Sequence, residues 1–147
     1  MKSIIFMIFV IFIFISCQNT NSYDELDSVI QDINPSIDLR NFHSVIVLPS
    51  DGCPSCIAAI KRSIIESRNK LDSTILIAIR IRDRKFFKEF KNLFSNIEVI
   101  VDENNTFGLI QYNTDYPWLL LLSKNEITNS IELKNPADTA WIKSLKP

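Results

Sequence analysis

The chain has 147 residues, of which 46% are hydrophobic and 22% are charged, and its formal net charge is -1. This length is enough for one domain with a real hydrophobic core, and the composition excludes a chain that is disordered throughout. The near-neutral charge argues against general nucleic-acid binding.

Residues 1–17 have the pattern of a targeting segment. Lys2 gives a positive start, and the apolar run at 4–15 has a length that suits a signal peptide but is too short to span a membrane. The segment ends in Phe14-Ile15-Ser16-Cys17, which resembles a bacterial lipoprotein cleavage box, although Leu is usual where this chain has Phe14. The resemblance implies cleavage before Cys17, attachment of lipid to Cys17, and a place on the cell envelope facing the periplasm. The alternative is an ordinary signal peptide or anchor with an incidental cysteine.

We therefore divide the chain into a signal peptide at 1–16, a tether at 17–22 and one domain at 23–147. The helical spacing of apolar residues at 23–33 predicts a short helix that Pro35 ends. Residues 36–40 are expected to add an edge strand.

The central feature is Cys53-Pro54-Ser55-Cys56. The apolar run at 44–49 before it predicts a central strand that is covered on both faces, and the apolar spacing after it predicts a helix. Two intervening residues bring two sulfurs within bonding reach if the first turn is helical. Cys53 then lies at the helix N-terminus, where unpaired N–H groups and the helix dipole favour its thiolate, and Pro54 fits the first helical position.

The remaining pattern alternates between strands and helices. We predict strands at 74–82 and 97–101, helices at 84–94 and 106–112, a turn or cap at Asp102, a hairpin of 118–123 with 127–133, and a last helix at 136–145 that buries Ala140, Trp141 and Leu145. This order predicts an α/β fold with a mixed, mostly parallel sheet, helices on both faces, and antiparallel strands at one side.

The order of elements around the CxxC is similar to the thioredoxin-like fold, and most closely to membrane-anchored thiol-disulfide oxidoreductases of the TlpA/ResA type. The segments at 97–102 and 106–112 resemble the strand and helix that this family inserts, and 114–120 resembles its cis-proline loop and following strand. The likeness covers about residues 40–147. It implies a cis bond before Pro117, and a backbone at Tyr116 and Pro117 that binds the partner peptide.

Two features depart from that family. Many members have Trp before the first cysteine, where this chain has Gly52. The family often buries an acid in the strand before the CxxC as a proton acceptor for the second cysteine, and the corresponding position here is Val47. These departures favour slow turnover or a protein that is not an enzyme.

The leading hypothesis is a lipid-anchored thiol-disulfide oxidoreductase. Cys53 attacks a protein disulfide and Cys56 resolves the mixed disulfide, with no cofactor and with a monomeric domain. Because only the helix start lowers the pKa of the Cys53 thiol, and because Asp51 would oppose its thiolate, we expect a reductant.

Two alternatives stay open, namely a non-catalytic thioredoxin-like binding module with a static Cys53–Cys56 disulfide, and a metallochaperone. His43 is the one histidine available as an additional metal ligand, and its place before a strand favours a surface or capping role.

A dense basic run follows the second predicted strand. We interpret it as a solvated face, and the alternative is a patch that binds anionic lipid or an acidic partner. Its members are Arg80, Arg82, Arg84, Lys85, Lys88 and Lys91.

Overall fold

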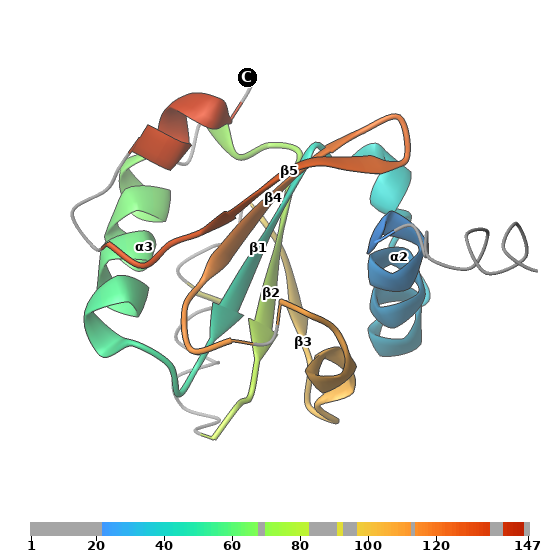
Figure 1. Ribbon diagram of the computed structural model, residues 1–147, viewed down its shortest axis with the longest axis horizontal. Coiled ribbons are helices and arrows are strands. Elements are labelled where there is room, and N and C mark those ends of the chain that lie inside the picture. The colour runs from blue at the N-terminus through green and yellow to red at the C-terminus, as the bar shows by residue number, and fades with distance from the viewer. Residues whose placement is uncertain are drawn as a thin grey trace, which may run out of the picture.

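The computed structural model describes residues 22–67, 70–82, 91–92, 97–112, 114–135 and 140–145 (Figure 1). The expected signal peptide at 1–16, Cys17, nearly all of the tether and most of the helix expected at 84–94 lie outside these residues. Within the described residues, no helix has the length and apolar character needed to cross a membrane.

A five-stranded mixed sheet forms the centre of the domain, with the strand order β3-β2-β1-β4-β5. The strands are β1 (Ser44–Pro49), β2 (Thr74–Ile79), β3 (Glu98–Val101), β4 (Trp118–Ser123) and β5 (Glu126–Glu132). The pairs β1–β2 and β2–β3 are parallel, whereas β1–β4 and β4–β5 are antiparallel. The predicted central strand, the parallel strands beside it and the hairpin at one side are thereby confirmed.

Every residue of β1 and β2 is buried. Because successive side chains of a strand point to opposite faces, each strand supplies two separate clusters of apolar side chains. Val45 and Val47 belong to one cluster, whereas Ile46 and Leu48 belong to the other. The continuous apolar run that predicts a covered strand therefore contributes buried side chains to both faces of the sheet.

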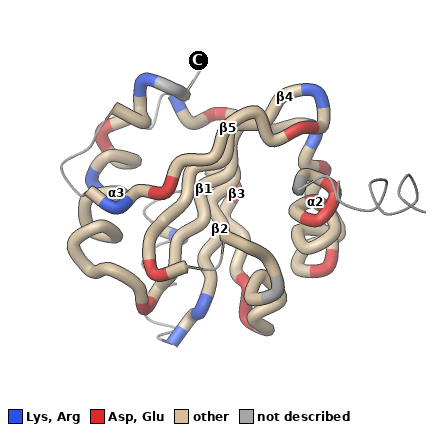
Figure 2. Tube along the Cα trace, in the orientation of Figure 1, with Lys and Arg blue, Asp and Glu red and all other residues tan. Residues whose placement is uncertain are grey.

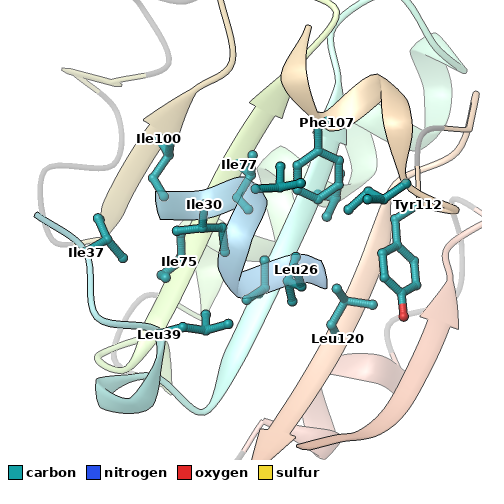
Figure 3. Close-up of a cluster of buried hydrophobic side chains, with 14 of the residues drawn as sticks. Leu26, Ile30, Ile37, Leu39, Ile75, Ile77, Ile100, Phe107, Tyr112 and Leu120 are labelled. Atoms are coloured by element: carbon teal, nitrogen blue, oxygen red, sulfur yellow. The ribbon is translucent and has the colours of Figure 1, made fainter. Parts of the chain in front are cut away.

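One helix packs into each of these clusters. Leu26 and Ile30 of α2 (Ser22–Ile33) lie among the strand side chains of the first cluster (Figure 3). Ile60 and Ile64 of α3 (Pro54–Glu66) lie in the second, and Figure 1 shows α2 and α3 on opposite sides of the sheet. Burial of one such side chain contributes about 1.5–3 kcal/mol. The apolar side of α3 thus holds its first turn, which carries the cysteines, at the end of β1.

Strand β2 is shorter than the 74–82 segment that the sequence predicts. It ends at Ile79, because Arg80 has a φ of 53°, in the left-handed region, and leaves the extended conformation. This conformation costs an L-residue roughly 1–2 kcal/mol. The carbonyl of Arg80 accepts a hydrogen bond from the Ser50 hydroxyl, which joins the ends of β2 and β1.

The prediction of an edge strand at 36–40 is wrong. The segment forms the 3-10 helix η1 (Leu39–Asn41), capped by Asp38, whose Oδ1 accepts a hydrogen bond from the Arg40 N–H at 3.1 Å. This local side-chain bond competes with strand pairing. Leu39 is fully buried and anchors the turn.

The segment after β3 carries the cap predicted at Asp102. Asp102 is 2% exposed, and its carboxylate accepts hydrogen bonds from the N–H groups of Thr106 and Phe107 at 2.8 and 2.7 Å. These bonds begin the 3-10 helix η3 (Thr106–Leu109), which is shorter than the helix expected at 106–112. Asp102 is thus a structural residue, as expected.

The C-terminal segment is described only in part. Residues 136–139 lie outside the described part, and the 3-10 helix η4 (Ala140–Ser144) follows them. Trp141 and Leu145 are buried in the α3-side cluster, as predicted, whereas Ala140 is exposed. In a 3-10 turn, residues three positions apart share a side, so Trp141 can face the sheet while Ala140 does not.

Candidate functional site

Cys53 and Cys56 form a disulfide at the start of α3, and their Cα atoms are 5.3 Å apart. Cys53 is the N-cap residue and Pro54 is in the first turn, as the sequence predicts. The helical first turn brings the two sulfurs together, because it places residues three apart on one side. Together with the sheet order, this arrangement is consistent with a thioredoxin-like α/β fold, and the close cysteine pair fits a CxxC motif of the redox type.

The two cysteines differ in exposure. Cys53 is half-buried, whereas Cys56 is 1% exposed. The Cys56 N–H donates to Cys53 Sγ at 3.3 Å, and the Ser55 Oγ lies 3.4 Å from the same sulfur. Cys53 is therefore the sulfur that a partner can reach, and it lies where donors would stabilise its thiolate.

In the part of the chain that the structure describes, the polar neighbour of the Cys56 sulfur is a backbone carbonyl. The Cys56 Sγ lies 3.5 Å from the carbonyl oxygen of Lys134, to which a reduced Cys56 thiol can donate. The side chain of Lys134 is 2.7 Å from Glu132, and this hydrogen bond raises the pKa of Lys134. Strand β1 offers only apolar side chains at 45–48. The carbonyl favours the protonated thiol of Cys56 in the reduced protein.

The loop before β4 meets the disulfide through an unexpected residue. The N–H of Cys53 donates to the carbonyl of Asp115 at 2.8 Å. Tyr116 is half-buried and Pro117 is buried beside it. The site thus combines two segments far apart in sequence, the CxxC turn and the loop at 114–117.

The expectation of a cis bond before Pro117 is wrong, because no peptide bond in the described part of the chain is cis. The Thr114 hydroxyl shapes the loop instead, since it donates to the Tyr116 carbonyl at 3.0 Å and accepts from the Tyr116 N–H and the Trp118 Nε1. These bonds shape the loop at 114–117 so that it leads into β4 with trans peptide bonds. The structure brings Tyr116 and Pro117 to the disulfide loop, and their role in peptide binding stays a prediction.

Gly52 is where the two segments touch. A Cβ atom added there would lie 2.2 Å from the Asp115 carbonyl oxygen and 2.8 Å from Pro49 Cγ. The φ of Gly52 is not in the left-handed region, so space is the reason for glycine at this position. The absence of a side chain at Gly52 therefore lets the Asp115 carbonyl approach Cys53.

Sequence reasoning missed an ion-pair network at this edge of the sheet. Arg80 Nε lies 2.7 Å from Asp51 Oδ1, and the other two guanidinium nitrogens each lie 3.0 Å from Asp115 Oδ1. Arg82 Nε lies 2.8 Å from Asp51 Oδ2. Figure 2 shows acidic and basic positions together at the lower ends of β1 and β2. Asp51 is thus paired and does not face Cys53 as an isolated charge.

A signal for this network was present in the sequence. Asp51 and Arg80 each follow one of two apolar runs, and adjacent parallel strands end at the same edge of a sheet. The basic run is therefore not one uniform face, because Arg80 and Arg82 bind Asp51. Residues Arg84, Lys85 and Lys88 lie outside the described part.

Hollows lie at both ends of β1. One, of about 320 Å³, adjoins Gly52 and Pro54 and is bordered by Ile57 and Ala58 of α3. The other, of about 270 Å³, includes His43 at the opposite end. His43 is therefore remote from the thiols, and the described residues include no group of three metal-binding side chains.

Comparison of the chain with protein-family models and with curated proteins finds no match.

Proposed function

We propose that the chain is a thiol-disulfide oxidoreductase that acts on protein disulfides through Cys53 and Cys56. The observation that carries this proposal is the contrast between a half-buried Cys53 at the start of α3 and a Cys56 that is 1% exposed behind it. An attacking thiol must be reached by its partner, whereas a resolving thiol needs to reach only the first sulfur. A disulfide that closes a four-residue loop adds little stability, so a purely structural role does not explain this bond.

The reaction runs in two exchanges. The Cys53 thiolate attacks one sulfur of a partner disulfide, and the other partner sulfur leaves as a thiolate. Cys56 then loses its proton and attacks Cys53 Sγ, which releases the second partner thiol and forms the Cys53–Cys56 disulfide. The partner gains two electrons and the chain loses two. A dithiol of another protein returns the chain to its reduced form by the reverse exchange.

We propose the direction of a reductant. Asp51 near Cys53 is paired with Arg80 and Arg82, so stabilisation of the Cys53 thiolate comes from the helix start and the first-turn N–H groups. Such modest stabilisation of the thiolate gives the reduced form no special advantage, and the disulfide is then hard to reduce.

The partner peptide is proposed to lie along Tyr116 and Pro117, next to Cys53. The hollow beside Pro54 offers room for an apolar side chain of that peptide, because Ile57 and Ala58 border it. Loop 114–117 approaches this hollow at Gly52.

Trapping of mixed disulfides tests the proposal. In cells, Cys56→Ser should accumulate mixed disulfides between Cys53 and partner proteins, because the resolving thiol is absent. Cys53→Ser should not, since Cys56 is buried. Non-reducing gels and mass spectrometry of the trapped species give the readout. Equal trapping by both variants, or by neither, would contradict the assigned roles.

We further propose that the protein is a lipoprotein of the bacterial envelope, in the manner of the TlpA/ResA type. The support is the sequence pattern that ends in Cys17, together with a disulfide, which persists in that compartment. Several acyl chains would give stable anchoring. Cys17→Ser should move the exported protein from the membrane to the soluble fraction, and an unchanged membrane fraction would count against the anchor.

A second candidate is a non-catalytic binding module with a static disulfide. The apolar strand β1 favours it, because no acid there can accept the Cys56 proton. Turnover of a protein disulfide in excess small dithiol separates the two functions. An oxidoreductase should speed the reduction of that protein disulfide above the rate with the dithiol alone, whereas a protein with a static bond should leave this rate unchanged.

A further inference from the structure

Arg80 contacts both the turn that leads to Cys53 and the loop at 114–117. Its backbone binds the CxxC turn through the Ser50 hydroxyl. Its side chain contacts Asp51 in that turn and Asp115 in the loop whose carbonyl accepts the Cys53 N–H. Arg80 makes these contacts directly after the end of β2, where its φ is 53°.

We propose that Arg80 is a positioning residue for Cys53, which sets the charge around this sulfur by neutralising Asp51 and holds loop 114–117 against the CxxC turn. This inference rests on the proposed role of Cys53 as the attacking thiol. Arg80, which directly follows the end of β2, then acts together with the CxxC turn and loop 114–117 in the proposed mechanism.

The charge effect follows from burial. The Asp51 side chain is 16% exposed and lies two residues before Cys53, so its carboxylate is poorly screened by water. Arg80 is 22% exposed, whereas Arg82, the other partner of Asp51, is 82% exposed. Arg80 therefore provides most of the compensation, because solvent weakens the pair with Arg82.

The Arg80 guanidinium forms an ion pair with Asp51 and donates two hydrogen bonds to Asp115. Asp115 is 78% exposed, so its side-chain contact with Arg80 is screened and weak. The carbonyl of Asp115 nevertheless binds the Cys53 N–H at 2.8 Å. Arg80 thus contacts the turn through Asp51 and the loop through Asp115, and its pair with Asp51 is the less screened of the two.

Other charged groups surround the site and stay unchanged in the test. Lys134 and Glu132 pair with each other on the Cys56 side, and Lys134 also lies over the Tyr116 ring at 5.7 Å. Lys61 of α3 borders the hollow that Asp51 also borders. These groups set a constant background, against which changes at Arg80 and Asp51 are compared.

The test uses charge changes of opposite sign in the full chain. Arg80→Gln leaves Asp51 under-compensated, which should raise the pKa of the reduced Cys53 thiol. Asp51→Asn removes the negative charge, which should lower it. The double variant should return toward the wild-type value, and Arg80→Lys should keep part of the effect. The pKa is read from the pH dependence of iodoacetamide alkylation of the Cys53 peptide by mass spectrometry, and far-UV circular dichroism confirms that each variant is folded.

A second readout is the equilibrium with glutathione. At a pH above the pKa of the thiol, Arg80→Gln should favour the disulfide by about threefold, and Asp51→Asn should disfavour it by a similar factor, as expected for one charge at close range in a partly solvated site. Arg40→Gln is the matched control, since Arg40 pairs with Asp38 before the other end of β1 and should change neither readout.

The outcomes separate a charge role from a purely structural one. If Arg80 merely stabilised the fold, Arg80→Gln and Asp51→Asn would shift the thiol pKa in the same direction or not at all, and the inference would be wrong. Neither readout needs a partner protein. Failure of the trapping experiment alone would therefore count against the proposed function and leave the Arg80 result standing.

Discussion

The two ends of β1 use polar residues in different ways. At the amino end, the hydroxyls of Ser44 and Thr74 are buried and lie 2.7 Å apart, so two neutral groups satisfy each other. At the carboxyl end, charged side chains of Asp51, Arg80 and Asp115 meet beside the disulfide. Three chain segments converge at this end, and a helix begins there.

The difference supports the proposal that thiol chemistry takes place at the carboxyl end. A neutral hydroxyl pair has little effect on the charge of a neighbouring group, and it holds two parallel strands together. A guanidinium between two carboxylates, next to a helix N-terminus, changes the stability of a nearby thiolate. The same strand thus has a structural end and a reactive end.

The largest expected effect comes from closing the gap at the reactive end. Gly52→Ala should lower the free energy of unfolding by about 1–3 kcal/mol, because the new Cβ meets backbone atoms of Asp115 and the loop must move. The Cys53 amide should lose protection from hydrogen exchange as its bond to Asp115 breaks. Urea unfolding and exchange mass spectrometry measure both effects.

Gly108→Ala is the control for that substitution. Its Cβ would meet only side-chain atoms of Asn105, which is exposed and able to move. Its unfolding free energy should change less than that of Gly52→Ala, and exchange at Cys53 should not change. Equal losses in the two variants would show that loop contact at Gly52 is unimportant.

The next effect tests the structural end. Ser44→Ala should destabilise the domain by about 1 kcal/mol, because it leaves the Thr74 hydroxyl buried without its partner. Ser44→Ala combined with Thr74→Val should recover much of this loss, since both polar groups are then gone. The glutathione equilibrium of the disulfide should be the same in all three proteins. A changed equilibrium would mean that the two ends of β1 are coupled.

The smallest effect concerns pH. Burial, and secondarily the carboxylates of Asp27 and Asp38, raises the pKa of Tyr23 in the folded domain. Because the folded value exceeds the unfolded value of about 10, the contribution of Tyr23 to stability is complete below that pH and is lost as the pH rises through the folded value. In the oxidised protein, Tyr23→Phe should therefore lose less stability than the wild type above pH ~10. An identical alkaline decline in both proteins would assign it to other groups.

Local patterns were sufficient for the start of α3 and for the central strands. Pro54 after Cys53, and apolar spacing after Cys56, determine a helix that begins at the first thiol, because capping and periodicity depend on neighbours in sequence. The apolar runs of β1 and β2 likewise indicate covered strands. Local pattern failed at 36–40, where the Asp38 carboxylate binds the Arg40 N–H in place of a strand partner.

Only the tertiary structure determined what surrounds Cys53. The sequence shows Asp51 as a charge that opposes the thiolate, and it shows Arg80 as part of a basic surface. Their pairing requires β1 and β2 to be parallel neighbours and β2 to end in a left-handed residue. The Asp115 carbonyl at Cys53 likewise depends on how loop 114–117 packs at Gly52. Such contacts join segments distant along the chain, so no pattern of neighbouring residues determines them.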